Sequence, residues 1–326
     1  MVLGLQWKYS GMKVISKTEN SHLATVYIAQ NSAGKLVEFV ESIQPPLSIH
    51  EKWVLIVSTL FGCPVDCIFC DAGGHYKGRM TAEEILFQID YPIRQRFPDG
   101  IIGTKKFKIQ FSRMGEPSFN PAVIEVLEKL PSIYTWQDFI PSLSTIAPQG
   151  TDKFFDRLLH IKKELYPASF QLQFSLHSTS ARQRDQIIPV RKWDLRHIAK
   201  YGEKFFSEGG KKITLNFAVS KDSIIDEKIL LRYFSPEFFL IKLTPVNPTY
   251  KARKNKIESQ NFSKELFDGF FPDKLKDAGY ETIISIGELE ENQIGSNCGQ
   301  FIQAYNRSCE KLPEAYTYQV YSTDNQ

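Results

Sequence analysis

The chain has 326 residues, of which 42% are hydrophobic and 24% charged, and its formal net charge is +3. This balance is that of an ordinary soluble globular protein. It contains no apolar run of about 18 residues, which argues against a membrane partner or span. The N-terminus shows no signal peptide, so we expect a cytoplasmic protein. A net charge this small neither predicts nor excludes an RNA partner.

Three short apolar, β-branched runs near the N-terminus predict a small antiparallel β meander. They cover residues 13–17, 24–29 and 36–42, and turn signals such as 31–34 separate them. Pro45-Pro46 then ends the meander.

From residue 54 onward, short apolar segments alternate with longer segments of helical period. The predicted strands are 54–58, 107–112, 142–147, 171–176, 213–219 and 239–245. The predicted helices are 81–97, 121–130, 152–165, 195–207 and 225–233. Thr81 and Glu84 form a capping box, and Pro121 suits a first helical position. The alternation predicts parallel strands joined by right-handed crossovers.

Six such units are too few to close an eightfold barrel, so the predicted fold is α/β, a partial (β/α)6 TIM-like barrel. The expected division is an N-terminal meander at 1–46, a barrel core at 47–250 and a C-terminal extension at 251–326. The extension is predicted to contain a helix at 263–278 and a strand at 282–286, and it carries Cys298. Two basic clusters, 105–108 and 251–256, are interpreted as solvated surfaces.

Three of the five cysteines lie within eight residues, directly after the first strand of the predicted barrel. Such clustering is typical of a metal site in a reducing compartment and not of a disulfide framework. Cys63, Cys67 and Cys70 can ligate three irons of a 4Fe-4S cluster, whereas a structural cluster or zinc site has four protein ligands. The open fourth iron can chelate S-adenosyl-L-methionine (SAM), which predicts a radical SAM enzyme. The alternatives are a zinc knuckle completed by a histidine such as His75, or three unrelated core thiols.

Polar residues near the later strands fit this chemistry. Gly115 lets the backbone approach a ligand closely, and Glu116 offers an acceptor for the amino group of SAM. Further candidates on or near later strands are Ser142, Ser144, Ser175, His177 and Asn247. Ligands of α/β barrels gather at the C-terminal ends of the strands, where the last three of these fall. The two serines of 142–147 lie early in their predicted strand and fit less well.

At this point the sequence resembles the RlmN/Cfr family of radical SAM adenine methyltransferases. Six blocks in order carry the resemblance and span residues 34–300. They are Gly34-Lys-Leu-Val-Glu38, Cys63 to Cys70, Met114-Gly-Glu-Pro117, Ser175-Leu-His177, Pro245-Val-Asn-Pro248 and Cys298-Gly-Gln300.

The resemblance implies a reaction that uses two SAM molecules and an electron donor such as flavodoxin or ferredoxin. One SAM methylates a C-terminal cysteine, matched here by Cys298. The other yields a 5′-deoxyadenosyl radical that removes a hydrogen from the S-methyl group, and the resulting carbon radical adds to an adenine carbon of RNA. Glu38 matches the family's proton acceptor. The expected cofactor-binding residues are Phe69, Gly115, Glu116, Ser142, Ser175, Leu176, His177 and Asn247.

Two departures from the family bear on the substrate. The family's second catalytic cysteine, which forms the disulfide that frees the product, is matched by Ile56. If 299–309 is helical, Cys309 lies about 16 Å along the axis from Cys298, too far for a disulfide, whose Cα atoms are about 6 Å apart. The chain also begins directly in the meander, without room for the family's helical RNA-binding domain.

Three functions are therefore open. The leading one is a radical SAM methyltransferase that acts through S-methylated Cys298, with RNA adenine as the candidate substrate. The second keeps the SAM-cleaving machinery but acts on a nucleotide, a metabolite or a peptide. The third is a non-catalytic iron–sulfur module that binds RNA or a protein. The side-chain pairs considered for RNA contact are Tyr76-Lys77-Gly78-Arg79 and Tyr250-Lys251.

Overall fold

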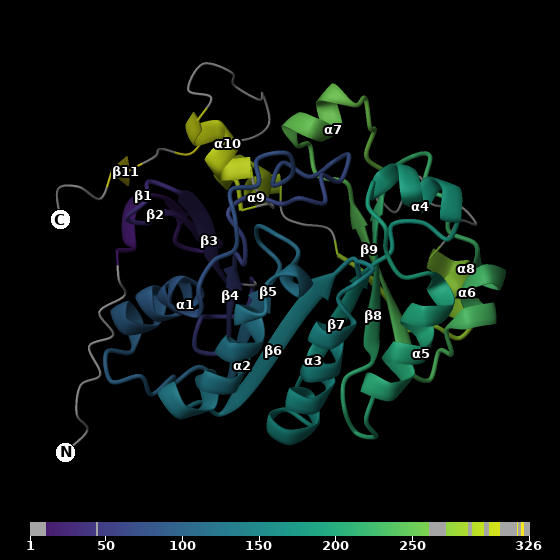
Figure 1. Ribbon diagram of the computed structural model, residues 1–326, viewed down its shortest axis with the longest axis horizontal. Helices are drawn as coiled ribbons and strands as arrows, with labels where there is room; N and C mark the ends of the chain where they lie inside the picture. Colours follow the sequence, from purple (N-terminus) through teal and green to yellow (C-terminus); the bar gives the residue numbers. More distant parts are fainter. Residues whose placement is uncertain are drawn as a thin grey trace.

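Eleven strands form one continuous sheet in the part of the chain that the structure describes (Figure 1). The computed structural model describes residues 11–43, 45–260, 272–285, 289–296, 300–306, 318 and 321–322. The strand order is β10-β9-β8-β7-β6-β5-β4-β3-β2-β1-β11. Pairing is antiparallel from β11 to β4 and parallel from β4 to β10, so the meander and the barrel share one sheet.

The strands of this sheet are β1 (Lys13–Asn20), β2 (Ala24–Gln30), β3 (Leu36–Ser42), β4 (Lys52–Val57), β5 (Lys106–Phe111), β6 (Asp138–Thr145), β7 (Gln171–Ser175), β8 (Ile213–Val219), β9 (Phe239–Pro245), β10 (Thr282–Ile284) and β11 (Tyr321–Ser322). The helices are α1 (Ala82–Arg96), η1 (Pro117–Phe119), α2 (Ala122–Ile133), α3 (Asp152–Leu165), α4 (Ala181–Ile187), α5 (Leu195–Phe205), α6 (Glu227–Tyr233), α7 (Tyr250–Lys254), α8 (Pro272–Asp277), α9 (Leu289–Ile294) and α10 (Gln300–Asn306).

The inner and outer faces of the parallel strands differ in polarity, and β5 shows why. Its sequence alternates, so successive side chains point to opposite faces. Phe107, Ile109 and Phe111 are fully buried in the main core beneath the helices. Lys108 and Gln110 face the other way, into the barrel. The hydrophobic core therefore lies between strands and helices, and the barrel interior is left for polar side chains.

The predicted fold is confirmed, with six parallel strands alternating with helices between residues 52 and 245. The helix at 152–165 has the predicted bounds, and the capping box of Thr81 and Glu84 is present. One strand was placed wrongly, because β6 starts at Asp138 and not at 142. Its start is hidden by Pro141, since proline is unusual inside a strand. The predicted helix at 263–278 is described from Pro272, because 261–271 lie outside the described residues.

Short segments after the strands cluster at one end of the barrel. In Figure 1, α7, α9 and α10 lie together at the end toward which the parallel strands run. No helix among the described residues is long and apolar enough to cross a membrane.

Candidate active site

A cavity of about 340 Å³ lies at the end of the barrel where the parallel strands finish. Several residues predicted from the sequence line it together. They are Phe69, Cys70, Ser175, His177 and Asn247. Their segments follow β4, β7 and β9, so the fold brings together side chains that are up to 178 positions apart in the sequence.

The loop that carries the three cysteines is held by its own backbone. Cys63 N–H donates to Ala72 O at 2.7 Å, and Cys70 N–H donates to Cys67 O at 3.1 Å. Gly62 has a φ of +77°, and a Cβ atom there would lie 2.3 Å from His75 O. A side chain at position 62 would clash with the backbone at His75, where the chain returns at the end of the loop, so glycine is required there.

The cysteines are partly buried thiols whose chemistry suits iron. Burial and the neighbouring Cys70 raise the pKa of the Cys63 thiol to about 12, and burial also raises the pKa of Cys67. Metal binding supplies the positive charge that deprotonates such thiols. Among the described residues, no three His, Cys, Asp or Glu side chains converge as the ligands of a single ion do. Three thiolates on a cubane each bind a different iron, so the donor set fits a cluster.

Gly115 and Glu116 organise the rim next to this loop. Gly115 has a φ of +99°, and a Cβ atom there would lie 2.5 Å from the Leu60 side chain. Glycine at this position therefore lets the backbone pack closely against Leu60, in the segment that leads into the loop of the three cysteines (the cluster loop). Glu116 is buried, and its carboxylate accepts hydrogen bonds from Thr145 Oγ1 at 2.6 Å and Ile146 N at 2.9 Å. Burial raises its pKa, which these hydrogen bonds oppose. Ser118 donates to the same carboxylate, so Glu116 joins the ends of β5 and β6.

His177 faces the cavity as a neutral imidazole. Its Nδ1 accepts a hydrogen bond from Ala218 N at 3.0 Å, which places the proton on Nε2. Burial, and to a smaller extent Arg184, lower its pKa to about 3. The Phe69 ring packs against His177 edge to face, with the ring centroids 5.0 Å apart. The site therefore offers one N–H donor in a fixed orientation beside an aromatic ring.

The remaining predicted contacts fall at different depths. Ser175 and Asn247 line the cavity, whereas Leu176 is fully buried in the core. Ser142 is buried near the middle of β6 and is not among the cavity-lining residues. Ser144, two positions on, lines the cavity and accepts a hydrogen bond from Gln173 Nε2 at 3.1 Å.

Glu38 lies in a buried ion pair that the sequence did not indicate. Its Oε1 lies 2.7 Å from Arg113 Nε, and its Oε2 accepts a hydrogen bond from Ile302 N at 2.7 Å. The other guanidinium nitrogens of Arg113 donate to the carbonyl oxygens of Gly295 and Ser296. The pair thus holds two points of the C-terminal segment. Cys298 and Cys309 lie outside the described residues.

Ile56, at the position of the family's second cysteine, also lines the cavity. Its side chain projects into the barrel because β4 alternates as β5 does. The position is therefore inside the candidate active site, but its side chain carries no thiol.

Two lysines in the barrel were missed by the sequence analysis. The cluster 105–108 was interpreted as a solvated surface, but Lys108 points inward and donates to Gln171 Oε1 at 3.0 Å. Burial, with Lys242 nearby, lowers the pKa of Lys108 to about 7. Lys242 lines the cavity, and burial lowers its pKa while the nearby Glu291 raises it. The strict alternation of 106–110 was the signal that places Lys108 opposite Phe107 and Ile109.

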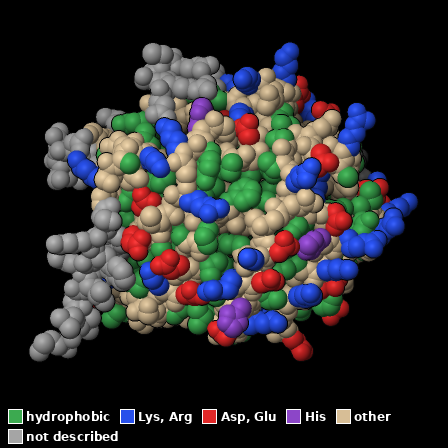
Figure 2. Space-filling model, viewed as in Figure 1, with side chains coloured by type: hydrophobic (Ala, Val, Ile, Leu, Met, Phe, Trp, Pro, Cys, Tyr) green, Lys and Arg blue, Asp and Glu red, His purple; other side chains and the backbone are tan. Residues whose placement is uncertain are grey.

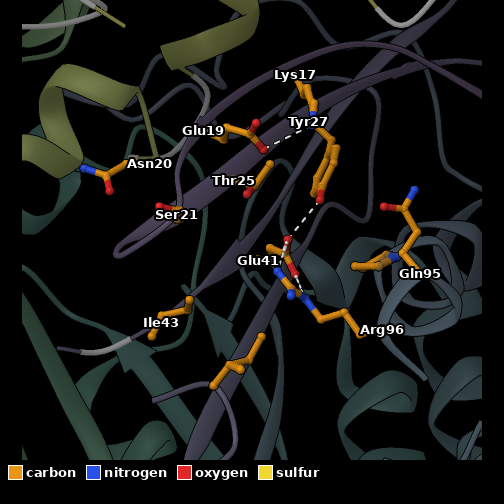
Figure 3. A pocket seen from close by; sticks show the side chains of 13 residues that line it. Lys17, Glu19, Asn20, Ser21, Thr25, Tyr27, Glu41, Ile43, Gln95 and Arg96 are labelled. Atoms are coloured by element: carbon orange, nitrogen blue, oxygen red, sulfur yellow. Dashed lines mark hydrogen bonds and ion pairs between the residues drawn. The ribbon is translucent and has the colours of Figure 1, made fainter. Parts of the chain in front are cut away.

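A second cavity, of about 360 Å³, lies between the meander and α1 (Figure 3). Its central carboxylate, Glu41, accepts hydrogen bonds from Tyr27 at 3.0 Å and from two nitrogens of Arg96 at 2.9 Å. Trp53 Nε1 donates to it at 3.3 Å. The carboxylate of Glu41 thus finds its hydrogen-bond partners within the protein, so we assign the cavity a structural role.

The face shown in Figure 2 carries interspersed Lys, Arg, Asp and Glu side chains around apolar patches, and its described residues form no continuous basic surface. Of the pairs considered for RNA contact, Tyr76 is exposed. Tyr250 was wrongly expected at the surface, since it is buried and Lys251 is ion-paired to Asp66.

Comparison with known proteins finds similar proteins that carry one name. No family model matches the sequence. A protein of Desulfitobacterium hafniense named a probable dual-specificity RNA methyltransferase RlmN is 28% identical over 262 residues, 77% of this chain and 68% of that protein. A Sulfurovum protein named a dual-specificity RNA methyltransferase RlmN is 23% identical, over 90% of this chain and 84% of its own length. Over most of its length the chain is therefore similar to proteins named RlmN RNA methyltransferases.

A solved structure supports the fold. The crystal structure of a radical SAM methyltransferase from Sphaerobacter thermophilus matches with a TM-score of 0.67 and 20% identity, covering 89% of this chain and 81% of that one. The family of these similar proteins uses SAM and a 4Fe-4S cluster, and the three thiols and the adjoining cavity of this chain fit both.

Proposed function

We propose that this RlmN-like enzyme holds one 4Fe-4S cluster through Cys63, Cys67 and Cys70 and cleaves SAM in the 340 Å³ cavity. The observation that carries the proposal is that Cys70 and Phe69 line the same cavity as His177 and Asn247. When bound, the cluster supplies the electron that cleaves SAM. The protein supplies a partly buried loop for the cluster and a polar wall that orients SAM.

Individual residues have distinct parts in this proposal. His177 presents its Nε2–H as a donor, because Nδ1 is already occupied by Ala218 N. Phe69 packs against His177 and closes one side of the cavity. Glu116 is not among the cavity-lining residues, but its Oε2 accepts one hydrogen bond from Ile146 N and retains a lone pair for the amino group of SAM. Ser175 and Asn247 add further polar groups to the cavity lining.

We further propose that Cys298 carries the methyl group and that the leading substrate is RNA adenine. The support is indirect but specific to this chain. Ser296, two residues before Cys298 in the sequence, lines the cavity, and Arg113 holds its carbonyl. Glu38, the matched proton acceptor, bonds the backbone at Ile302 on the other side. The relatives named RNA methyltransferases favour RNA as the substrate class.

The test is anaerobic reconstitution followed by addition of SAM and dithionite. The expected products are 5′-deoxyadenosine and a Cys298 peptide heavier by one methyl group in place of a hydrogen. Cys63→Ala is expected to abolish the first product, whereas Cys309→Ala, the matched control, is expected to retain it. A wild-type protein with an intact cluster that forms no 5′-deoxyadenosine would contradict the proposal.

A second candidate keeps SAM cleavage but uses a substrate other than RNA. Two observations favour it: Ile56 in the cavity removes the family's route of product release, and Lys242 offers the cavity a cation suited to an anionic nucleotide or metabolite. The Cys298 peptide decides between the two. Formation of 5′-deoxyadenosine without methylation of Cys298 would support this second function.

A further inference from the structure

The two ends of the open barrel are joined at the cavity mouth, although their strands are not. In the described sheet β4 pairs with β3 and β5, and β9 pairs with β8 and β10, so β4 and β9 do not bond to each other. The loop after β4 carries the three cysteines, and the segment after β9 carries Asn247 and α7. These two segments form a dense set of contacts across the gap.

Asp71, directly after the last cluster cysteine, is the centre of these contacts. Its side chain is buried, and its two carboxylate oxygens accept hydrogen bonds from the backbone amides of Tyr250 at 3.0 Å and Lys251 at 2.9 Å. Hydrogen bonds from amides to an ionised carboxylate are stronger than those between neutral groups. A single side chain therefore fixes two consecutive backbone groups of the opposite segment.

Thr249 and Asn255 bond the cluster loop in the other direction. Thr249 Oγ1 donates to Phe69 O at 2.7 Å and accepts from Ala252 N at 2.9 Å, and Asn255 Nδ2 donates to Ile68 O at 2.6 Å. The carbonyls that receive these bonds belong to the two residues between Cys67 and Cys70. The backbone between two cluster ligands is therefore held from the β9 side.

The bonded segments also line the same cavity. Phe69 and Cys70 line it from one segment, and Asn247 and Thr249 line it from the other. We propose that Asp71 and Thr249 are positioning residues that fix the cluster loop against the SAM-contacting segment after β9, and so set the distance between the open iron and the bound SAM. This inference rests on the proposed function for SAM, but the loop contact itself is independent of it.

The test compares Asp71→Ala and Thr249→Val with Asp90→Ala as the matched control. Asp90 is also buried and bonds to Tyr134 Oη and Arg94, but it lies on α1, away from the cavity-lining residues. In reconstituted protein, Asp71→Ala is expected to keep the iron content of wild type, because the three thiols are unchanged, and to weaken SAM binding about tenfold. The Thr249→Val effect is smaller, and the double variant weakens SAM binding less than the two single effects combined, because both residues fix the same contact.

A readout without the cluster separates this inference from the proposed function. In the apo-protein, iodoacetamide is expected to alkylate Cys70 about tenfold faster in Asp71→Ala than in wild type, because the loop opens locally more often. Asp90→Ala is expected to lower the melting temperature while leaving both SAM affinity and Cys70 alkylation unchanged.

The inference is overturned if Asp71→Ala lowers the melting temperature as Asp90→Ala does but retains wild-type SAM affinity and wild-type alkylation. If wild type itself binds no SAM, the proposed function fails. The alkylation rates then still decide whether Asp71 fixes the cluster loop.

Discussion

The cavity mouth is held on two sides by contacts of different kinds. On the cluster side, Asp71 and Thr249 bond to backbone amides and carbonyls. On the meander side, Glu38 and Arg113 form a fully buried ion pair whose remaining hydrogen bonds reach the backbone of the C-terminal segment. Both sides use a buried polar side chain to hold a segment to which we assign a part in the proposed reaction.

Because the contacts differ, substitutions on the two sides should change different properties of the protein. Removing one partner of the Glu38–Arg113 ion pair leaves the opposite charge buried, whereas removing Asp71 or Thr249 removes hydrogen bonds to neutral backbone groups and leaves no buried charge behind. The meander side should therefore respond to single substitutions in overall stability, and the cluster side chiefly in SAM binding.

The largest expected effect is that of breaking the ion pair. Arg113→Met leaves Glu38 charged and buried, and we expect it to lower the free energy of unfolding by about 3–5 kcal/mol. Glu38→Gln keeps an acceptor for Ile302 N but removes the carboxylate charge that faces the Arg113 guanidinium. We expect it to lower the free energy of unfolding by a comparable amount. Urea denaturation of both single variants and the double variant measures this. Strict additivity of the two costs would contradict a direct ion pair.

Lys108 adds a third case, a partly buried cation whose hydrogen-bond partner is the neutral Gln171. Its folded-state pKa of about 7 lies below the ordinary value of about 10.4, so the folded protein releases this proton first as pH rises. The charged form therefore costs stability below pH 7, and the cost disappears as pH rises toward 10.

We expect Lys108→Met to raise the free energy of unfolding at pH 6 by about 1–2 kcal/mol and to have little effect near pH 10. Lys129→Met, which removes a partly exposed lysine paired with Glu125, is the control and should change stability by less than about 0.5 kcal/mol. A gain for Lys108→Met that does not depend on pH would indicate better packing and not a removed charge.

Thr249→Val should have a smaller effect on stability than Arg113→Met or Lys108→Met. It removes the hydrogen bond to Phe69 O and the one accepted from Ala252 N at the start of α7 while keeping the side-chain shape, so we expect a loss of about 1 kcal/mol in thermal or urea unfolding. A loss as large as that of Arg113→Met would show that the two sides of the mouth do not differ as described.

The smallest expected effect concerns His177, whose pKa of about 3 leaves it neutral across the physiological range. Because the unfolded chain has a histidine pKa of about 6.5, this residue contributes stability that is lost as pH falls below that value. Histidine NMR signals recorded from pH 5 to 8 should show no titration of His177. A midpoint between pH 5 and 7 would contradict the buried, Ala218-bonded imidazole.

Local patterns explain how much of the fold could be predicted. The alternation of 106–111 and the capping box at Thr81 fix each element through neighbouring residues, and both are present in the structure. Helix α4 was missed because its sequence, ARQRDQI, has no apolar period. The start of β6 was missed because Pro141 lies inside it.

The candidate site was predictable only where its residues sit in short motifs. Cys63, Cys67 and Cys70 and the residues at strand ends belong to such motifs. The Asp71 contact joins positions about 180 residues apart, and Arg113 joins the meander to the C-terminal segment. Such contacts depend on how non-neighbouring loops meet at the rim, which no local period or spacing encodes.

The central claim is that three cysteines leave one iron open to SAM within the barrel cavity. The most direct measurement is the electron paramagnetic resonance spectrum of the reconstituted, dithionite-reduced protein with and without SAM. We expect a cluster signal whose g values change when SAM is added, because SAM becomes a ligand of the open iron. A cluster signal that saturating SAM leaves unchanged would contradict it.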